Sequence, residues 1–256
     1  MDHKSFNVEV ADQIAVLTID RPKANAIDST TSRAMGEAFV AFENDPAVRV
    51  VIITGAGDRF FSAGWDLSAG EDFDIDNGVG GFGGFPDLPN RRKPVIAAVN
   101  GMAVGGGCEI AVAADLIVAA DHAQFFVPEA GLGILPDAGS VRLPRLLPAH
   151  IATELMLTGR RMPAAEAAHY GLVNRVVAST ELLTAARALA NEIIASAPLS
   201  VAAILDISRR TANMDVADAM KAIRTFDSYR AAIDSDDAQE GTNSFNEKRP
   251  PVWKGR

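Results

Sequence analysis

The sequence of 256 residues has little of what several classes of protein require. It contains one cysteine, Cys108, which excludes an intrachain disulfide and fits a reducing compartment. It has no run of about 18 apolar residues that could cross a bilayer, and its N-terminus lacks the charged and then apolar pattern of a secretory leader. We therefore expect a cytoplasmic protein that does not act in a membrane.

Positive charge is also scarce. The formal net charge is −9, and no long run of Lys or Arg interrupts the acidic balance. This argues against nucleic acid or an anionic membrane surface as the main partner, and an anionic substrate would need local positive charge. The four histidines have no metal-ligand spacing, so we expect no metal site.

The apolar residues that are present, 48% of the chain, predict one sizeable α/β domain or a core with a small appendage. Strand and helix patterns alternate over the first two-thirds, and helices follow almost alone. This order predicts a mostly parallel sheet sandwiched by helices, with a helical C-terminal module. Strands are expected at 6–10, 14–19, 48–54, 94–99, 116–119, 124–127 and near 172–177; helices at about 29–44, 180–197, 199–212, 215–234 and 236–247.

A Gly/Asp-rich insert at 68–90 interrupts this pattern. Residues 78–83 fit G-x-G-x-x-G by letters, but they neither follow a strand nor open an apolar helix, so a dinucleotide site is rejected. Asp72, Asp74 and Asp76 alternate like a calcium loop, yet Asn77 and Gly83 stand where Gly and Glu are needed. A long loop of this kind is usually functional or mobile, and we expect the acidic run to be a solvated lid.

The most informative stretch runs from Pro94 to Asp115 and reads as strand, glycine turn and helix. Gly105, Gly106 and Gly107 allow close approach to a ligand, and a helix start leaves N–H groups free to hold negative charge. Glu109 then lies one turn inside an apolar helix, where a buried carboxylate needs a partner, a proton or a use. If this stretch is considered alone, an equal alternative is that the glycines only permit close packing of the helix on the strand and that Glu109 faces solvent.

Several motifs occur together in one order: Phe61-Ser-Ala-Gly-Trp-Asp-Leu67, Pro94-Val-Ile-Ala-Ala-Val-Asn-Gly101, Gly105-Gly-Gly-Cys-Glu109 and Pro128-Glu129. With these the chain resembles the enoyl-CoA hydratase/isomerase (crotonase) family over nearly its whole length. The resemblance implies a spiral of ββα units (residues 1–195) and a C-terminal helical oligomerisation region (196–256). It also implies a homotrimer or a dimer of trimers.

The resemblance assigns an oxyanion hole to the backbone N–H groups of Trp65 and Gly106. Such donors stabilise the negative charge that develops on a thioester oxygen. It also pairs Glu109 with Glu129 as the acid and base that act on a substrate double bond, without saying which is which. The alternative is two surface glutamates.

The same resemblance implies an acyl-CoA substrate, with CoA as part of the substrate and no separate cofactor. Residues near the nucleotide and pantetheine are expected to be Lys23, Ala24, Ala26, Ala63, Asp66 and Leu67, and Gly64, Val104 and Pro128 complete the set. Phe245 and Lys248 resemble C-terminal residues that serve a neighbouring subunit's site, the lysine as a phosphate partner. Lys23 and Lys248 could instead be ordinary solvated lysines.

Asp137 departs from ordinary enoyl-CoA hydratases, where a glycine is usual. It could support double-bond migration, bind a cationic substrate group, or cap the helix expected from Ala138. Further stretches, including 20–28 and 157–162, resemble members that hydrate crotonobetainyl-CoA, whose γ carbon carries a trimethylammonium group. Cation–π contacts could hold that group, and the candidates for its site are Trp65, Phe82, Phe85 and Asp137. Cys108 and the 70–89 loop depart from those members. A general enoyl-CoA hydratase, an isomerase and an inactive scaffold are the alternatives.

Overall fold

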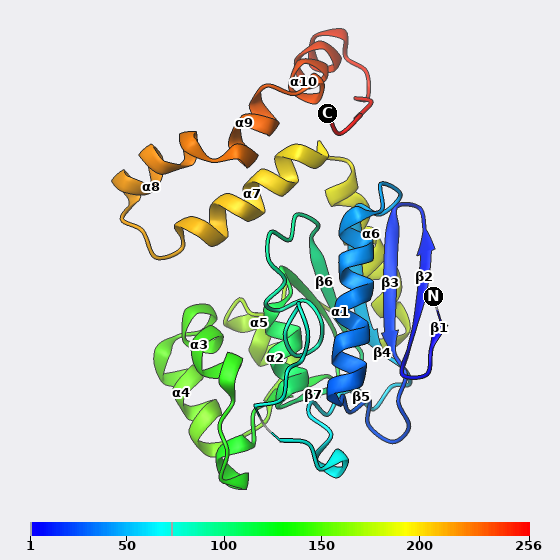
Figure 1. The fold of residues 1–256 in the computed structure, drawn as a ribbon, viewed down its shortest axis with the longest axis vertical. Coiled ribbons are helices and arrows are strands. Elements are labelled where there is room, and N and C mark those ends of the chain that lie inside the picture. The colour runs from blue at the N-terminus through cyan, green and yellow to red at the C-terminus, as the bar shows by residue number, and fades with distance from the viewer. Residues whose placement is uncertain (1, 73) are drawn as a thin grey trace.

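The computed structural model describes residues 2–72 and 74–256, and a seven-stranded sheet forms its centre (Figure 1). The strand order is β1-β2-β3-β4-β6-β8-β11. The hairpin of β2 and β3 is antiparallel, and β3, β4, β6, β8 and β11 pair in parallel. The strands are β1 (Asp2–His3), β2 (Phe6–Ala11), β3 (Ile14–Ile19), β4 (Val50–Gly55), β6 (Val95–Val99), β8 (Leu116–Ala120) and β11 (Arg175–Val177).

The middle strands of this sheet are covered on both faces. Every residue of β4 and β6 is buried, which explains their continuous apolar runs without alternation. Strands with both faces covered are typical of parallel sheets in α/β proteins. The sequence therefore predicted the central strands and their parallel pairing correctly.

A second, four-stranded sheet packs in the next layer, with the order β10-β9-β7-β5. Its strands are β5 (Phe60–Ser62), β7 (Met102–Val104), β9 (Gln124–Phe126) and β10 (Met162–Pro163). Apart from β9 these strands were not predicted, because two or three residues are too short to display a period. Helices cover both faces of the large sheet as predicted, and this small sheet joins them on one face.

Helix α6 (Leu182–Ile194) covers the other face of the large sheet, where Leu182, Ala186 and Leu189 share a core with residues of β4, β6 and β8. On the face where the four-stranded sheet packs, α1 (Ser29–Asn44) and α2 (Gly106–Ala113) share one core with that sheet. Asp28 caps α1 by accepting a hydrogen bond from Thr31 N–H at 2.7 Å, as one of the two predicted caps. The remaining helices of the core are α3 (Asp137–Leu146), α4 (Ala149–Thr158) and α5 (Ala164–His169).

Four helices form an arm that extends beyond the core (Figure 1): α7 (Pro198–Thr211), α8 (Val216–Ala222), α9 (Asp227–Ile233) and α10 (Asp236–Glu247). The single helix predicted for 215–234 is wrong, because Phe226 adopts an extended conformation and its ring is buried. The division of the chain at residue 195 stays a prediction. Within the described residues no single helix is long and apolar enough to cross a membrane; one pair, bent by 102°, meets the length and composition criteria together.

Candidate active site

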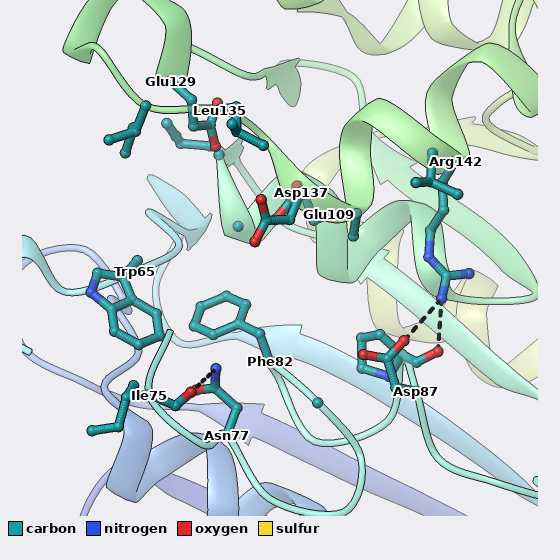
Figure 2. Close-up of a pocket in the computed structure, with 18 of the residues that line it drawn as sticks. Trp65, Ile75, Asn77, Phe82, Asp87, Glu109, Glu129, Leu135, Asp137 and Arg142 are labelled. Carbon is teal, nitrogen blue, oxygen red and sulfur yellow. Dashed lines mark hydrogen bonds and ion pairs between the residues drawn. The ribbon is translucent and has the colours of Figure 1, made fainter. Parts of the chain in front are cut away.

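A cavity of about 1210 Å³ lies between the 75–87 segment, the start of α2 and the start of α3 (Figure 2). More than half of the predicted site residues line it, although they come from four separate stretches of the chain. These are Ala63, Trp65, Leu67, Val104, Gly106, Glu109, Pro128, Glu129 and Asp137. The structure therefore brings the two predicted amides and the two predicted glutamates to one cavity.

In residues 2–72 and 74–256 the backbone N–H groups of Trp65 and Gly106 donate to no acceptor, so both are available to a ligand. The bridge between Ile27 and Trp65 uses the N–H of Ile27 and the N–H of Asp66, and it leaves the N–H of Trp65 itself unused. Gly106 is the first residue of α2, so its N–H has no acceptor within the helix. Both residues line the cavity, and the N-terminal end of α2 adds partial positive charge.

Two glycines bring these amides together. Gly64 has φ of 78°, and a Cβ there would lie 2.6 Å from the Gly106 nitrogen. Gly105 has φ of 53°, and a Cβ there would lie 2.6 Å from Oε1 of Glu129. Both positions need positive φ and also lack the space for a methyl group. Gly64 therefore lets its loop approach the Gly106 amide, and Gly105 lets the turn before α2 approach the Glu129 carboxylate.

Glu129 is almost fully buried, with 8% of its surface exposed. It begins a short 3-10 helix, Glu129–Leu132, and two residues separate this helix from the end of β9. Its Oε2 is buried without a hydrogen-bond partner among the described residues. Burial, reinforced by the charges of Glu109 and Asp137, raises the pKa of Glu129 to about 7. This carboxyl can hold a proton near neutral pH.

Glu109 lies in the first turn of α2 and is better supported than Glu129. The N–H of Gly139, in the first turn of α3, donates a hydrogen bond to Oε1 of Glu109 at 2.7 Å. Burial raises the pKa of Glu109, and this hydrogen bond opposes the rise. The alternative in which Glu109 and Glu129 are two surface glutamates is therefore wrong.

Asp137 is the first residue of α3 and lines the same cavity. The predicted alternative that it caps a helix is wrong, because Pro136 occupies the N-cap position and no side chain caps this helix. Asp137 is exposed, and its charge contributes to the raised pKa values of Glu109 and Glu129. Three carboxylates thus share one side of the cavity.

The opposite side is aromatic, and Figure 2 shows Trp65 and Phe82 across the cavity from the three carboxylates. The two ring centroids are 5.5 Å apart. The prediction that Phe85 helps to hold a cationic group is wrong, because Phe85 is buried against Phe39 in the core. Phe82 and Phe85 lie in one glycine-rich segment, and the sequence does not indicate which of the two rings faces the cavity.

The insert at 68–90 is not only a solvated lid. Asp72, Asp74 and Asp76 are exposed as predicted, but several residues between Ile75 and Asp87 form a wall of the cavity. Arg142 on α3 reaches this wall, where it donates to the carbonyl of Pro86 at 2.7 Å. Arg142 carries no motif and was missed from the sequence.

Lys23 and Ala24 line a separate cavity of about 290 Å³ rather than the main one. Gly64 and Ala26 line neither; Ala26 accepts a hydrogen bond at 2.6 Å from Arg21, an arginine that the sequence did not single out. Arg21 also pairs with Asp66 at 3.3 Å, so the negative charge of Asp66 is compensated locally. The two loops are therefore tied side by side, although the chain separates them by about forty residues.

Phe245 and Lys248 do not reach the cavity within this chain. Phe245 is 83% exposed on α10, and Lys248 ends that helix with φ of 54°. Figure 1 places α10 at the end of the molecule opposite α3 and α4. Their predicted service to a neighbouring subunit stays a prediction.

Other reactive groups add little to the site. Cys108 is buried, and burial raises the pKa of its thiol, which makes it a poor nucleophile. In residues 2–72 and 74–256, no group of three His, Cys, Asp or Glu side chains is placed to hold a metal ion.

Comparison with known proteins agrees with this arrangement. A family model described as enoyl-CoA hydratase/isomerase matches residues 9–256. The carnitinyl-CoA dehydratase of Salmonella arizonae is 56% identical over 248 residues, which cover 94% of this chain and 95% of that protein. That of Salmonella typhi is 55% identical over 249 residues, 95% of each chain.

Solved structures give the same result for the fold. The enoyl-CoA hydratase from Mycobacterium tuberculosis H37Rv superimposes with a TM-score of 0.91 at 38% identity, over 99% of this chain and 100% of that one. The enoyl-CoA hydratase from Bacillus anthracis superimposes with a TM-score of 0.90 at 32% identity and the same coverage. Because the family model spans residues 9–256 and relatives of 55–56% identity cover nearly the whole chain, the chain belongs to the enoyl-CoA hydratase/isomerase family.

Proposed function

We propose that this protein adds water reversibly to the double bond of a short enoyl-CoA, and that its substrate pair is crotonobetainyl-CoA and carnitinyl-CoA. The observation that carries the reaction is the meeting of two free amides with Glu109 and Glu129 around one cavity. The carnitinyl-CoA dehydratases that match 94–95% of the chain support the choice of substrate.

The reaction follows from where charge develops. Water loses a proton to one carboxylate while its oxygen bonds to Cβ, and the double-bond electrons move toward the thioester oxygen. The amides of Trp65 and Gly106 stabilise that oxygen, at roughly 3 kcal/mol for each well-placed donor. The second carboxyl then delivers its proton to Cα, and the two carboxyls exchange a proton before the next turnover.

The two environments suggest which glutamate has which role. Glu129, with a pKa raised to about 7, is the group that can carry a proton to Cα. Glu109 is oriented by the N–H of Gly139, a donor that favours its ionised form. We therefore assign the base to Glu109 and the acid to Glu129.

The trimethylammonium group of the proposed substrate cannot donate conventional hydrogen bonds, so its site must offer aromatic faces or negative charge. Trp65 and Phe82 supply rings on one side, and Asp137 supplies a carboxylate on the other. Each cation–π contact contributes about 0.5–2 kcal/mol. An uncharged butenoyl group would forgo both contributions.

The assembly and the CoA end belong to the same proposal. The arm exposes large apolar side chains, such as Ile204, Val216 and Met220, which support burial against other copies in a trimer or a dimer of trimers. Lys248 of a neighbouring copy would then meet a CoA phosphate, and Lys23 would lie near the nucleotide. No separate cofactor is needed, because CoA is part of the substrate, and we propose cytoplasmic action.

The test compares two substrates in one assay. Purified protein is given crotonobetainyl-CoA or crotonyl-CoA, and formation of the 3-hydroxyacyl thioester is followed. We expect kcat/KM to be at least about tenfold higher for the cationic substrate, because its tip makes additional contacts. A tenfold preference for crotonyl-CoA would instead identify a general enoyl-CoA hydratase.

Asp137 favours a second candidate function, migration of the double bond, because a third carboxylate lines the cavity. An isomerase would depend on Glu129 or Asp137 more than on Glu109, and it would leave no hydrated product. Trapping a 3-hydroxyacyl-CoA as the main product excludes it. Unchanged turnover in Glu109→Gln would revive an inactive scaffold as the non-enzymatic alternative.

A further inference from the structure

The segment Gly78–Gly84, whose letters imitate a dinucleotide motif, has a different use in this structure. It folds back on itself and packs against α1 and α2, so that Gly80, Gly83 and Gly84 have no room for side chains. A Cβ on Gly80 would lie 1.8 Å from the Gly84 carbonyl oxygen, and a Cβ on Gly83 would lie 2.5 Å from Cδ1 of Ile110 on α2. A Cβ on Gly84 would lie 2.6 Å from the backbone of α1.

This tight turn places Phe82 directly against the oxyanion site. A Cβ on Gly106 would lie 2.5 Å from a ring carbon of Phe82, so the ring already occupies the space beside this glycine. The ring also contacts Trp65 at a centroid distance of 5.5 Å. Phe82 therefore lies next to Trp65, as Figure 2 shows, and next to Gly106, the two residues whose amides would bind the thioester oxygen.

Polar contacts hold the turn in place. The hydroxyl of Ser32 on α1 accepts from the N–H of Gly83 at 3.0 Å and donates to the carbonyl of Gly81 at 3.1 Å. On the other side, Arg142 donates to the carbonyl of Pro86. The backbone on both sides of Phe82 is thus tied to helices of the core.

We propose that Phe82, held by the glycine turn 78–84, sets the upper size limit of the acyl group that this enzyme accepts. The proposal rests on the proposed function, because it takes the thioester to bind at Trp65 and Gly106. An acyl chain leaving that position runs between the carboxylates and Phe82. With the turn tied at both ends, a longer chain cannot displace the ring by moving the backbone, and it is rejected by overlap.

Binding of saturated acyl-CoAs tests this without relying on turnover. Dissociation constants for butyryl-, hexanoyl- and octanoyl-CoA are measured by titration calorimetry on the full chain, on Phe82→Ala and on Phe82→Leu. We expect the parent protein to bind butyryl- and hexanoyl-CoA more tightly than octanoyl-CoA, because the acyl tip of the proposed substrate reaches about as far as a hexanoyl chain. In Phe82→Ala, the octanoyl-to-butyryl affinity ratio should rise by at least about tenfold, because added methylenes gain buried apolar surface. Phe82→Leu should give a smaller rise.

The matched control is Val79→Ala, which changes an apolar side chain on the same turn. Val79 is 54% exposed and does not line the cavity, so the affinity ratio should stay within twofold of the parent. An unchanged ratio in folded Phe82→Ala overturns the proposal. Phe82→Leu decides the question in the same way if the alanine variant does not fold.

The two proposals fail separately. If butyryl-CoA binds and the ratio responds to Phe82, but crotonobetainyl-CoA is not hydrated, the size limit stands and the proposed reaction falls. If the reaction occurs and the ratio ignores Phe82, only the size limit falls.

Discussion

The cavity and the C-terminal arm of this molecule differ in how far their side chains are buried within one chain. The core encloses its two glutamates and two amides by itself, with glycines fitted so closely that single methyl groups would collide. The arm buries few large side chains and exposes Val216, Ile233 and Phe245. The groups proposed to react therefore all lie in the core, while the arm exposes apolar side chains that are proposed to meet other copies.

The most severe test of this division is the loss of the proton donor. Glu129→Gln should lower kcat by about 10³-fold, since a positioned general acid contributes roughly 10²–10⁴-fold. Glu37→Gln, on the exposed face of α1, is the matched control and should leave kcat unchanged. Steady-state kinetics on both variants, with circular dichroism to verify folding, decides it; a Glu129→Gln enzyme within threefold of the parent contradicts the assignment.

The second largest effect is expected at Gly105, whose backbone lies against the carboxylate of Glu129. Gly105→Ala should lower kcat by roughly 10–100-fold, because its Cβ would collide with the carboxylate of Glu129 and about 1 Å of misplacement can cost 10²-fold. Gly70→Ala is the matched control, because Gly70 also has positive φ, 66°, but no atom within 4 Å of the added Cβ. Both variants should lose thermal stability from backbone strain. An equal kcat in Gly105→Ala and Gly70→Ala would show that backbone strain, rather than the collision with Glu129, accounts for the loss of activity.

The pH dependence sharpens the contrast between the two glutamates. An acid with a pKa of about 7 loses its proton as pH rises, so kcat/KM should fall about tenfold per pH unit well above 7. Glu109 must be ionised to accept a proton, so activity should also fall at acid pH, with the midpoint above the ordinary glutamate value because its pKa is raised. A rate profile flat from pH 7 to 9 would remove Glu129 as the acid in the free enzyme.

A smaller effect is expected from the third carboxylate. Asp137→Asn should lower kcat/KM for crotonobetainyl-CoA by about three- to tenfold relative to crotonyl-CoA, because it removes only a solvent-exposed charge near the cation. The ratio between the two substrates in one preparation is the measurement. Loss of both activities in equal proportion would give Asp137 a role in the chemistry rather than in selection.

The smallest effect should come from the arm. Lys248→Ala should raise KM about two- to fivefold without changing kcat, since one exposed phosphate contact contributes modestly to binding. Kinetics are paired with size-exclusion chromatography, which should show the same assembly as the parent. A change in kcat would mean that the arm takes part in the chemistry and would break the division between arm and core.

Much of the core could be predicted because its signals are local. The hairpin at the N-terminus, the central strands and α1 with its Asp28 cap follow from apolar runs and capping residues. The short strands β5, β7 and β10 could not be predicted, because each exists only through pairing with distant segments. The break at Phe226 escaped for a similar reason, since its ring is buried only after the arm folds.

At the site, the sequence by itself determined the groups that are proposed to react, which are two glutamates and the glycines before a helix, and a motif order that identifies the family. It also supplied the aromatic and acidic residues that are proposed to hold the acyl tip, namely Trp65, Phe82 and Asp137. Only the tertiary structure decided that Phe82 faces the cavity and Phe85 the core, that Asp137 is not a cap, and that Arg142 holds the opposite wall. The physical reason is that these roles depend on packing between segments far apart in the chain, whereas glycine freedom and carboxylate chemistry belong to each residue on its own.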